Sequence, residues 1–272
     1  MQSRELTFDI VDDLVAAYRR GKTPAPNGND RFSASSISPL VELAFSSAQA
    51  SLLATPWLDP FTQADLRSVL RGTQSLWFDT LGLRGVMRTI FDPLKKEDDV
   101  PRTQFLMTAR KSAETAGLPA TVAQYMAAAL KEMESNIREH SERPETGLLA
   151  FQAAHGSFEF VAADRGVGVL ATLREADEFK NLTDHGRALH LTLQEGVSRH
   201  GRDPGHGNGF RDLFVGLQSL SADLRFRSGD HALLISGARA DLKQARLAQK
   251  SPMDGFLAAV HCHAPTPSHA HH

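Results

Sequence analysis

The sequence contains only one cysteine, Cys262, among 272 residues. A single cysteine cannot form a disulfide within the chain, which fits a reducing compartment. No apolar run approaches the ~20 residues that a helix needs to cross a bilayer. The charged first residues, MQSRELTFDIVDDL, lack the apolar segment of a signal peptide. These absences predict a cytoplasmic protein without a membrane-spanning segment.

An excess of charge is also absent. The chain carries 30 Lys and Arg against 32 Asp and Glu, a formal net charge of −2. This balance gives no electrostatic reason to expect nucleic acid or an acidic membrane as a partner. The hydrophobic fraction of 41% and the charged fraction of 23% are typical of a globular protein, and the length suits one large domain or two modest ones.

Three regions differ in pattern. Residues 1–100 are expected to be helix-rich, with helical apolar spacing near the start, but they show no motif that indicates chemistry. Residues 101–240 have the clearest pattern. Residues 241–272 form a C-terminal extension that ends in HCHAPTPSHAHH, residues 261–272. This tail is rich in proline and histidine and is predicted to be disordered, so its histidines do not define a metal site.

Within residues 101–240, hydrophobic periodicity and turn residues predict an alternation of strands and helices. In chain order the expected elements are a strand at 104–109, a helix at 110–118, a long helix at 120–140, a hairpin of strands 147–154 and 158–163, a helix from about Asp184, a helix at 211–224, and strands 224–228 and 231–237 joined at a Gly229-Asp230 turn.

The long helix carries a polar stripe, because Glu132, Asn136 and His140 lie at i, i+4 and i+8. A carboxylate near a triphosphate can orient or deprotonate a nucleophile. An amide oxygen one turn away is a hard neutral ligand suited to Mg²⁺. By themselves these three residues are more simply explained as a solvated helix face.

A second motif, Asp164-x-Gly166-x-Gly168, ends the second strand of the predicted hairpin. A carboxylate there can accept a hydrogen bond from the exocyclic amine of a base, and glycines let the backbone approach a ligand closely. An ordinary Asp/Gly turn is the alternative.

A third motif, residues 205–210 with glycines at Gly205, Gly207 and Gly209, precedes a predicted helix. Unobstructed backbone N–H groups at a helix N-terminus suit phosphate oxygens. The segment is neither a Walker A loop nor a dinucleotide fingerprint, because no Gly-Lys-Ser/Thr follows it and no βαβ unit surrounds it. A surface loop is the alternative.

In this order the three motifs resemble the N, G1 and G2 boxes of the GHKL superfamily (gyrase, heat-shock chaperone, histidine kinase and mismatch-repair ATPases). Within it, LKEMESNIREHSE is most similar to the N box of bacterial anti-sigma-factor serine kinases, although Ile137 stands where many members have alanine. The resemblance implies an α+β fold, a two-layer α/β sandwich of the Bergerat type, with residues 101–240 as an ATP-binding domain.

The resemblance also implies roles for the motif residues. Glu132 would be the general base, Asn136 the Mg²⁺ ligand and Asp164 the adenine contact. The glycines would serve the same ligand: Gly166 and Gly168 would shape the base pocket, and Gly205, Gly207 and Gly209 would border the phosphates. No role is assigned to His140. The implied cofactors are ATP and Mg²⁺.

The position of the first histidine and the short segment after the motifs argue against some members of the superfamily. A sensor histidine kinase needs an acceptor histidine upstream of its ATP domain, and the first histidine here is His140. A gyrase-like or chaperone-like machine needs large domains after the ATPase. The expected function is therefore a regulatory ATPase or serine/threonine kinase that acts on a partner protein, or alternatively a nucleotide-gated binding module without turnover. Residues 1–100 would serve in dimerisation, partner binding or sensing, and these options stay open.

Overall fold

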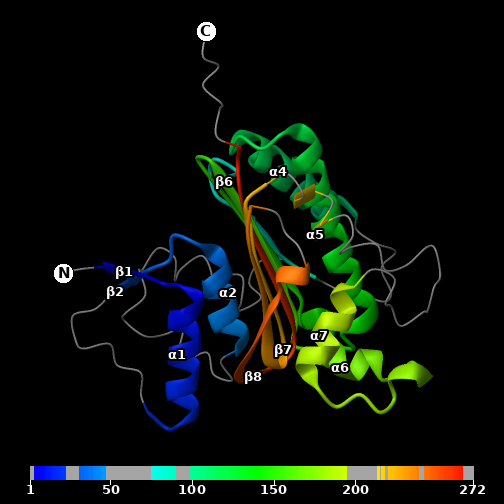
Figure 1. Cartoon of the computed structure of the whole chain (residues 1–272). Helices are drawn as coiled ribbons and strands as arrows, with labels where there is room; N and C mark the ends of the chain where they lie inside the picture. The colour runs from blue at the N-terminus through cyan, green and yellow to red at the C-terminus, as the bar shows by residue number, and fades with distance from the viewer. Residues whose placement is uncertain are drawn as a thin grey trace.

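A six-stranded antiparallel sheet forms the centre of the molecule (Figure 1). In this computed structural model the described residues are 3–22, 31–46, 75–89, 99–194, 213–214, 216–217, 220–238 and 242–265. The sheet order is β3-β4-β5-β6-β8-β7. Its strands are β3 (Leu76–Phe78), β4 (Arg84–Arg88), β5 (Leu148–Ala154), β6 (Ser157–Ala163), β7 (Ala222–Gly237) and β8 (Arg246–His263).

Both faces of the sheet are covered, which explains why β5 is apolar almost throughout rather than alternating. Leu149 and Phe151 pack in one hydrophobic core. Leu148 and Ala150, which point the other way, pack in a second core with residues of the two N-terminal helices. The α+β prediction is confirmed. The sequence predicts a two-layer sandwich for residues 101–240; in the chain as described, the N-terminal helices cover the second face of the sheet and make three layers (Figure 1).

One face carries most of the helices. They are α4 (Asp99–Thr115), α5 (Ala120–His140), α6 (Gly168–Leu173) and α7 (His185–Leu193). The predicted helix at 120–140 is confirmed as α5, whose buried residues Val122, Met126 and Met133 repeat at helical spacing. It ends before Pro144, where Glu142 adopts a left-handed φ of 59°. The predicted hairpin is confirmed as β5–β6.

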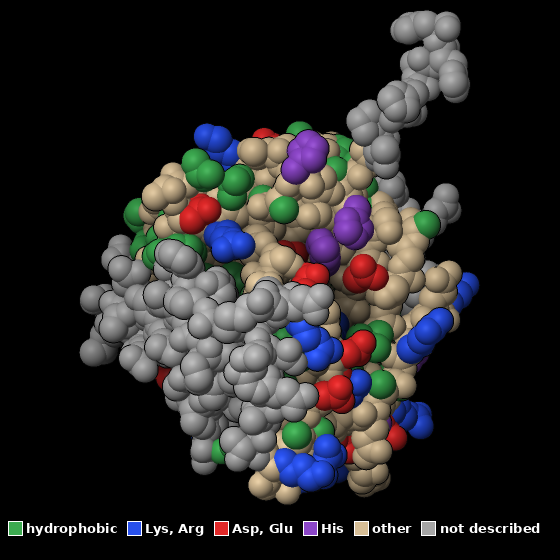
Figure 2. Space-filling model, turned by 90° about the vertical axis from the view of Figure 1, so that its left-hand side faces the viewer, with side chains coloured by type: hydrophobic (Ala, Val, Ile, Leu, Met, Phe, Trp, Pro, Cys, Tyr) green, Lys and Arg blue, Asp and Glu red, His purple; other side chains and the backbone are tan. Residues whose placement is uncertain are grey.

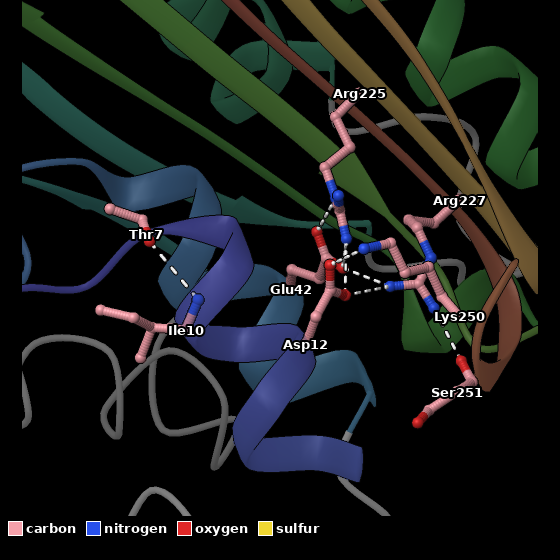
Figure 3. A network of polar contacts seen from close by, with 8 residues as sticks. All are labelled: Thr7, Ile10, Asp12, Glu42, Arg225, Arg227, Lys250 and Ser251. Carbon is pink, nitrogen blue, oxygen red and sulfur yellow. Dashed lines mark hydrogen bonds and ion pairs between the residues drawn. The ribbon is translucent and has the colours of Figure 1, made fainter. Parts of the chain in front are cut away.

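The other face carries α1 (Phe8–Arg19) and α2 (Ile37–Ser46), preceded by the parallel pair of β1 (Ser3–Glu5) and β2 (Arg31–Ser33). Thr7 caps α1, since its hydroxyl accepts a hydrogen bond from the Ile10 N–H at 3.4 Å (Figure 3). None of the described helices is both long and apolar enough to span a bilayer.

A buried ionic network joins these two helices to the sheet (Figure 3). The Arg225 guanidinium lies 2.7 Å from Glu42 of α2 and 2.8 Å from Asp12 of α1. Arg227 also pairs with Glu42, and Lys250 of β8 lies 2.6 Å from Asp12. The Glu42 side chain is completely buried. Removing one partner of such a network leaves an uncompensated charge, so the network fixes where α1 and α2 dock.

Three predicted elements differ from the structure. Residues 104–109 lie inside α4 rather than in a strand, because Phe105, Ala109 and Ala113 recur at helical spacing and are all buried. Gly229-Asp230 is not a turn, since β7 runs through it with a register shift. Gly229 has a φ of 56°, and a glycine of positive φ suits a β-bulge as well as a tight turn. The predicted helix at 211–224 is also too long, because β7 begins at Ala222.

The sheet extends across both predicted domain boundaries. Strands β3 and β4 come from residues 1–100, and β8 comes from residues 241–272. The prediction of a disordered tail is wrong for its first three residues, because His261 to His263 end β8 and Cys262 is buried. Residues 266–272 of that tail lie outside the described residues.

Candidate functional site

The end of β6 holds a buried carboxylate. Asp164 follows the strand and is only 4% exposed. Its carboxylate accepts a hydrogen bond from the Gly166 N–H at 2.7 Å, and its own N–H donates to the Phe256 carbonyl at 3.0 Å. Burial raises the pKa of Asp164 from 3.8 to about 6, and hydrogen bonds to the backbone of Gly166 and Phe256 oppose that rise. Active sites are one setting in which burial perturbs the pKa of a carboxylate in this way.

The loop that begins with this carboxylate, residues 164–168, lies against the C-terminal end of α5. The Val167 N–H donates to the Ser141 carbonyl at 3.0 Å. A Cβ at Gly166 would overlap the same carbonyl, so only glycine fits there. The Thr172 hydroxyl donates to the His140 carbonyl at 3.4 Å. The structure thus brings the second predicted motif onto the helix that carries the first.

Strands β7 and β8 contact this loop through Ser228 and Gly255. The Ser228 hydroxyl accepts a hydrogen bond from the Val169 N–H at 3.0 Å and donates to the Gly255 carbonyl at 2.8 Å. Gly168 has a φ of 77°, and a Cβ there would lie 2.8 Å from the Ser228 oxygen. A Cβ at Gly255, where φ is 74°, would lie 2.6 Å from an Asp164 carboxylate oxygen.

Ser228 and Gly255 were not identified from the sequence. Gly255 has a usable signal, because a glycine inside a strand marks a bulge or a close backbone approach. Ser228 carried none, since one serine in LRFRS does not differ from a solvent-facing residue.

Glu132 and Asn136 are half-buried on α5, beside its buried face. Asn136 precedes Ser141 by five residues, a rise of about 7.5 Å along the helix, and Glu132 precedes it by nine, about 13.5 Å. Glu134 between them is buried and forms ion pairs with Arg102 at 2.7 Å and Arg138 at 3.5 Å, so its role is structural.

The third motif, with Gly205, Gly207 and Gly209, lies outside the described residues. The described residues that follow it pack on the N-terminal half of α5. Leu213 is buried, and a Cβ at Gly216 would lie 2.7 Å from the Cβ of Tyr125. The described residues after the third motif therefore pack on α5, the helix that carries Glu132 and Asn136.

A cavity of about 350 Å³ lies elsewhere, between α1, the start of α2 and strands β6, β8 and β7. Its lining includes Glu159, Asp223, Arg225 and His261. Asp164 and the stripe on α5 do not belong to its lining, so this cavity is distinct from the site that the sequence predicts.

Comparison with known protein families, with curated proteins and with solved structures finds no match.

Proposed function

We propose that this chain is a Mg-ATP-binding regulatory protein of the GHKL type, an ATPase or serine/threonine kinase of the anti-sigma-factor kinase kind that acts on a partner protein. The observation that carries the proposal is the seating of the 164–168 loop on the end of α5 through Gly166 and Ser141. This contact brings together two motifs that are separated by the 23 residues 141–163, which include the β5–β6 hairpin.

The proposed adenine contact rests on the state of Asp164. With a pKa of about 6, the carboxyl is mostly ionised at pH 7 and can accept a hydrogen bond from the adenine amine. Its two backbone hydrogen bonds hold the group in one orientation before a ligand arrives. Guanine has no amine at the same ring position, so this contact selects ATP over GTP.

The proposed phosphate contacts follow from the order of residues along α5. A nucleotide whose base meets Asp164 and whose phosphates extend along α5 passes Asn136 before it reaches Glu132. Asn136 offers Mg²⁺ an amide oxygen, and Mg²⁺ would neutralise phosphate charge while keeping several waters. Glu132 would then orient a nucleophile at the far end. Gly205, Gly207 and Gly209 would border the same phosphates.

Isothermal titration of the full chain with Mg-ATP, GTP and Mg-free ATP tests the proposal. We expect the parent to bind Mg-ATP in preference to both other ligands. Asp164→Asn should weaken ATP binding by about 10- to 100-fold, because a mispaired buried polar group costs ~1–3 kcal/mol. The control Asp177→Asn, at an exposed position, should bind as the parent does. Equal affinity for ATP and GTP, or no binding at all, would overturn the proposal.

A turnover assay on the same preparation separates the two forms of the function. Release of phosphate, or its transfer to a partner protein, supports the enzyme. Selective Mg-ATP binding without turnover supports a nucleotide-gated binding module instead.

A further inference from the structure

Two histidines and an aspartate meet at the end of strands β7 and β8. His261 and His263 are two residues apart on β8, so their side chains point to the same face of the sheet. Asp223 of β7 lies directly opposite His261 in the strand register. One possible ligand atom from each of the three residues lies within 4.8 Å of the others. The two imidazole rings are 4.7 Å apart between centroids.

We propose that Asp223, His261 and His263 bind a divalent transition-metal ion of the Zn²⁺ class. Imidazole nitrogens and a carboxylate oxygen are ligands that Zn²⁺ accepts at about 2.0–2.2 Å. In tetrahedral coordination such ligand atoms lie about 3.3 Å apart, so rotation of the side chains is enough to close the site. Asp223 and His263 are exposed, which leaves them free to rotate.

Among the described residues beside this cluster, only these three are placed to act as ligands. Glu159 flanks His261 from β6, but its carboxylate already accepts hydrogen bonds from the hydroxyls of Ser36 and Ser38 and from the Ile37 N–H, at 2.6–2.9 Å. Cys262 points to the opposite face, where its thiol is buried and donates to the Phe158 carbonyl. Because side chains alternate along β8, the two histidines lie on the same face and Cys262 lies on the other, where it cannot act as a ligand.

A fourth coordination position would remain for water or a small ligand. The 350 Å³ cavity includes Asp223 and His261 in its lining, so this position has a recess beside it. Figure 2 shows histidine side chains gathered beside acidic ones around a hollow on this face of the molecule. Three protein ligands with one open position is the arrangement of zinc sites that bind an exchangeable ligand.

This site is separate from the proposed nucleotide site. His263 pairs with Ser157 at the start of β6, whereas Asp164 follows the end of that strand, about 20 Å away. The metal would link β7 to β8 at the far end of the sheet. The inference does not depend on ATP binding.

Zinc titration of the full chain tests the site, in a background where His269, His271 and His272 of the tail are replaced by alanine. We expect one Zn²⁺ per chain with micromolar or tighter affinity. His261→Ala and Asp223→Asn should each weaken it by about 100-fold or more, since even residues that only support metal ligands are worth about 10- to 100-fold. His190→Ala, on the opposite face in α7, is the matched control and should bind as the background does.

Two further measurements distinguish a loss of metal binding from misfolding of the variant. Zn²⁺ should raise the melting temperature of the background chain and not that of His261→Ala, while both melt alike in EDTA. Co²⁺ in place of Zn²⁺ should give the visible absorption of four-coordinate rather than six-coordinate cobalt. Unchanged affinity in His261→Ala and Asp223→Asn, or binding only at millimolar zinc, would overturn the proposal.

Discussion

Replacing Asp164 by asparagine should make the ligand-free protein more stable at neutral pH. A pKa raised from 3.8 to about 6 means that the folded protein prefers the neutral form of this carboxyl. The difference corresponds to about 3 kcal/mol of folding free energy. That contribution is fully present below about pH 4 and is lost as the pH rises through about 6. Asparagine cannot ionise, so it should keep most of that free energy at pH 7.

The measurement is urea unfolding of the parent and of Asp164→Asn at several pH values from 4 to 8. The difference in unfolding free energy should grow in favour of the variant by up to ~3 kcal/mol across the range and level off above about pH 7. Asp177→Asn should show no such trend, because the Asp177 side chain is exposed. The unfolding free energy of the parent is subtracted from that of the variant at each pH. The contributions of the other carboxylates and histidines then cancel, because both proteins share them.

A difference that stays flat with pH, or that favours the parent at neutral pH, would refute the reasoning. If the more stable variant also loses the stabilisation that Mg-ATP gives the parent, the ionisable Asp164 lowers the stability of the free protein but is required for nucleotide binding. That pairing is common at functional sites.

Three other predictions concern separate parts of the structure. Glu132→Ala should keep near-normal Mg-ATP affinity and lose about 100-fold in turnover, whereas Asn136→Ala should lose the Mg²⁺-dependent part of binding in calorimetry; equal losses in both would contradict their roles. Gly166→Ala should destabilise the protein in urea by more than the ~1 kcal/mol expected for Gly156→Ala, because the first overlaps the backbone at the end of α5 and the second meets only open space at a φ of 78°. Glu42→Ala should cost ~3–5 kcal/mol, since it leaves the two buried arginines of β7 with too little negative charge, and a loss below 1 kcal/mol would show that the network is dispensable.

Individual helices and the hairpin were predictable because apolar repeats, turn residues and helix caps lie within the element itself. The 120–140 helix has a long apolar repeat, and the β5–β6 hairpin has two apolar runs around a Gly156 turn whose φ is 78°. The start of α7 was also found, since Asp184 caps the helix by accepting a hydrogen bond from the Arg187 N–H at 2.7 Å.

Pairings between distant segments could not be read from the pattern. Nothing in HALLISG shows that it continues β7 rather than returning as a hairpin, because a bulge and a turn use the same Gly-Asp signal. The second helical layer was missed for a related reason. Its docking uses Arg225 and Arg227, residue types expected at the surface, and they are buried by charges from residues about 200 positions earlier.

The candidate site shows the same division. Asp164 and Gly166 follow from a motif at the end of a recognisable strand, and the structure places them on α5 as the order of motifs suggests. Ser228 lies 59 residues after its partner Val169, and Gly255 lies further still along the chain. The sequence places the histidines at 261 and 263 in a tail because proline and histidine dominate the composition that follows them.

The position of β8 affects how this protein can be synthesised. β8 lies between β6 and β7, so β7 touches the rest of the sheet only through a strand that leaves the ribosome after it. The two arginines that anchor the N-terminal helices therefore have no fixed place until residues up to 263 have emerged. We expect the nascent chain to pack α2 first against β5 and β6, which are already made, and to complete the ionic contacts of α1 and α2 only after β8 has been translated.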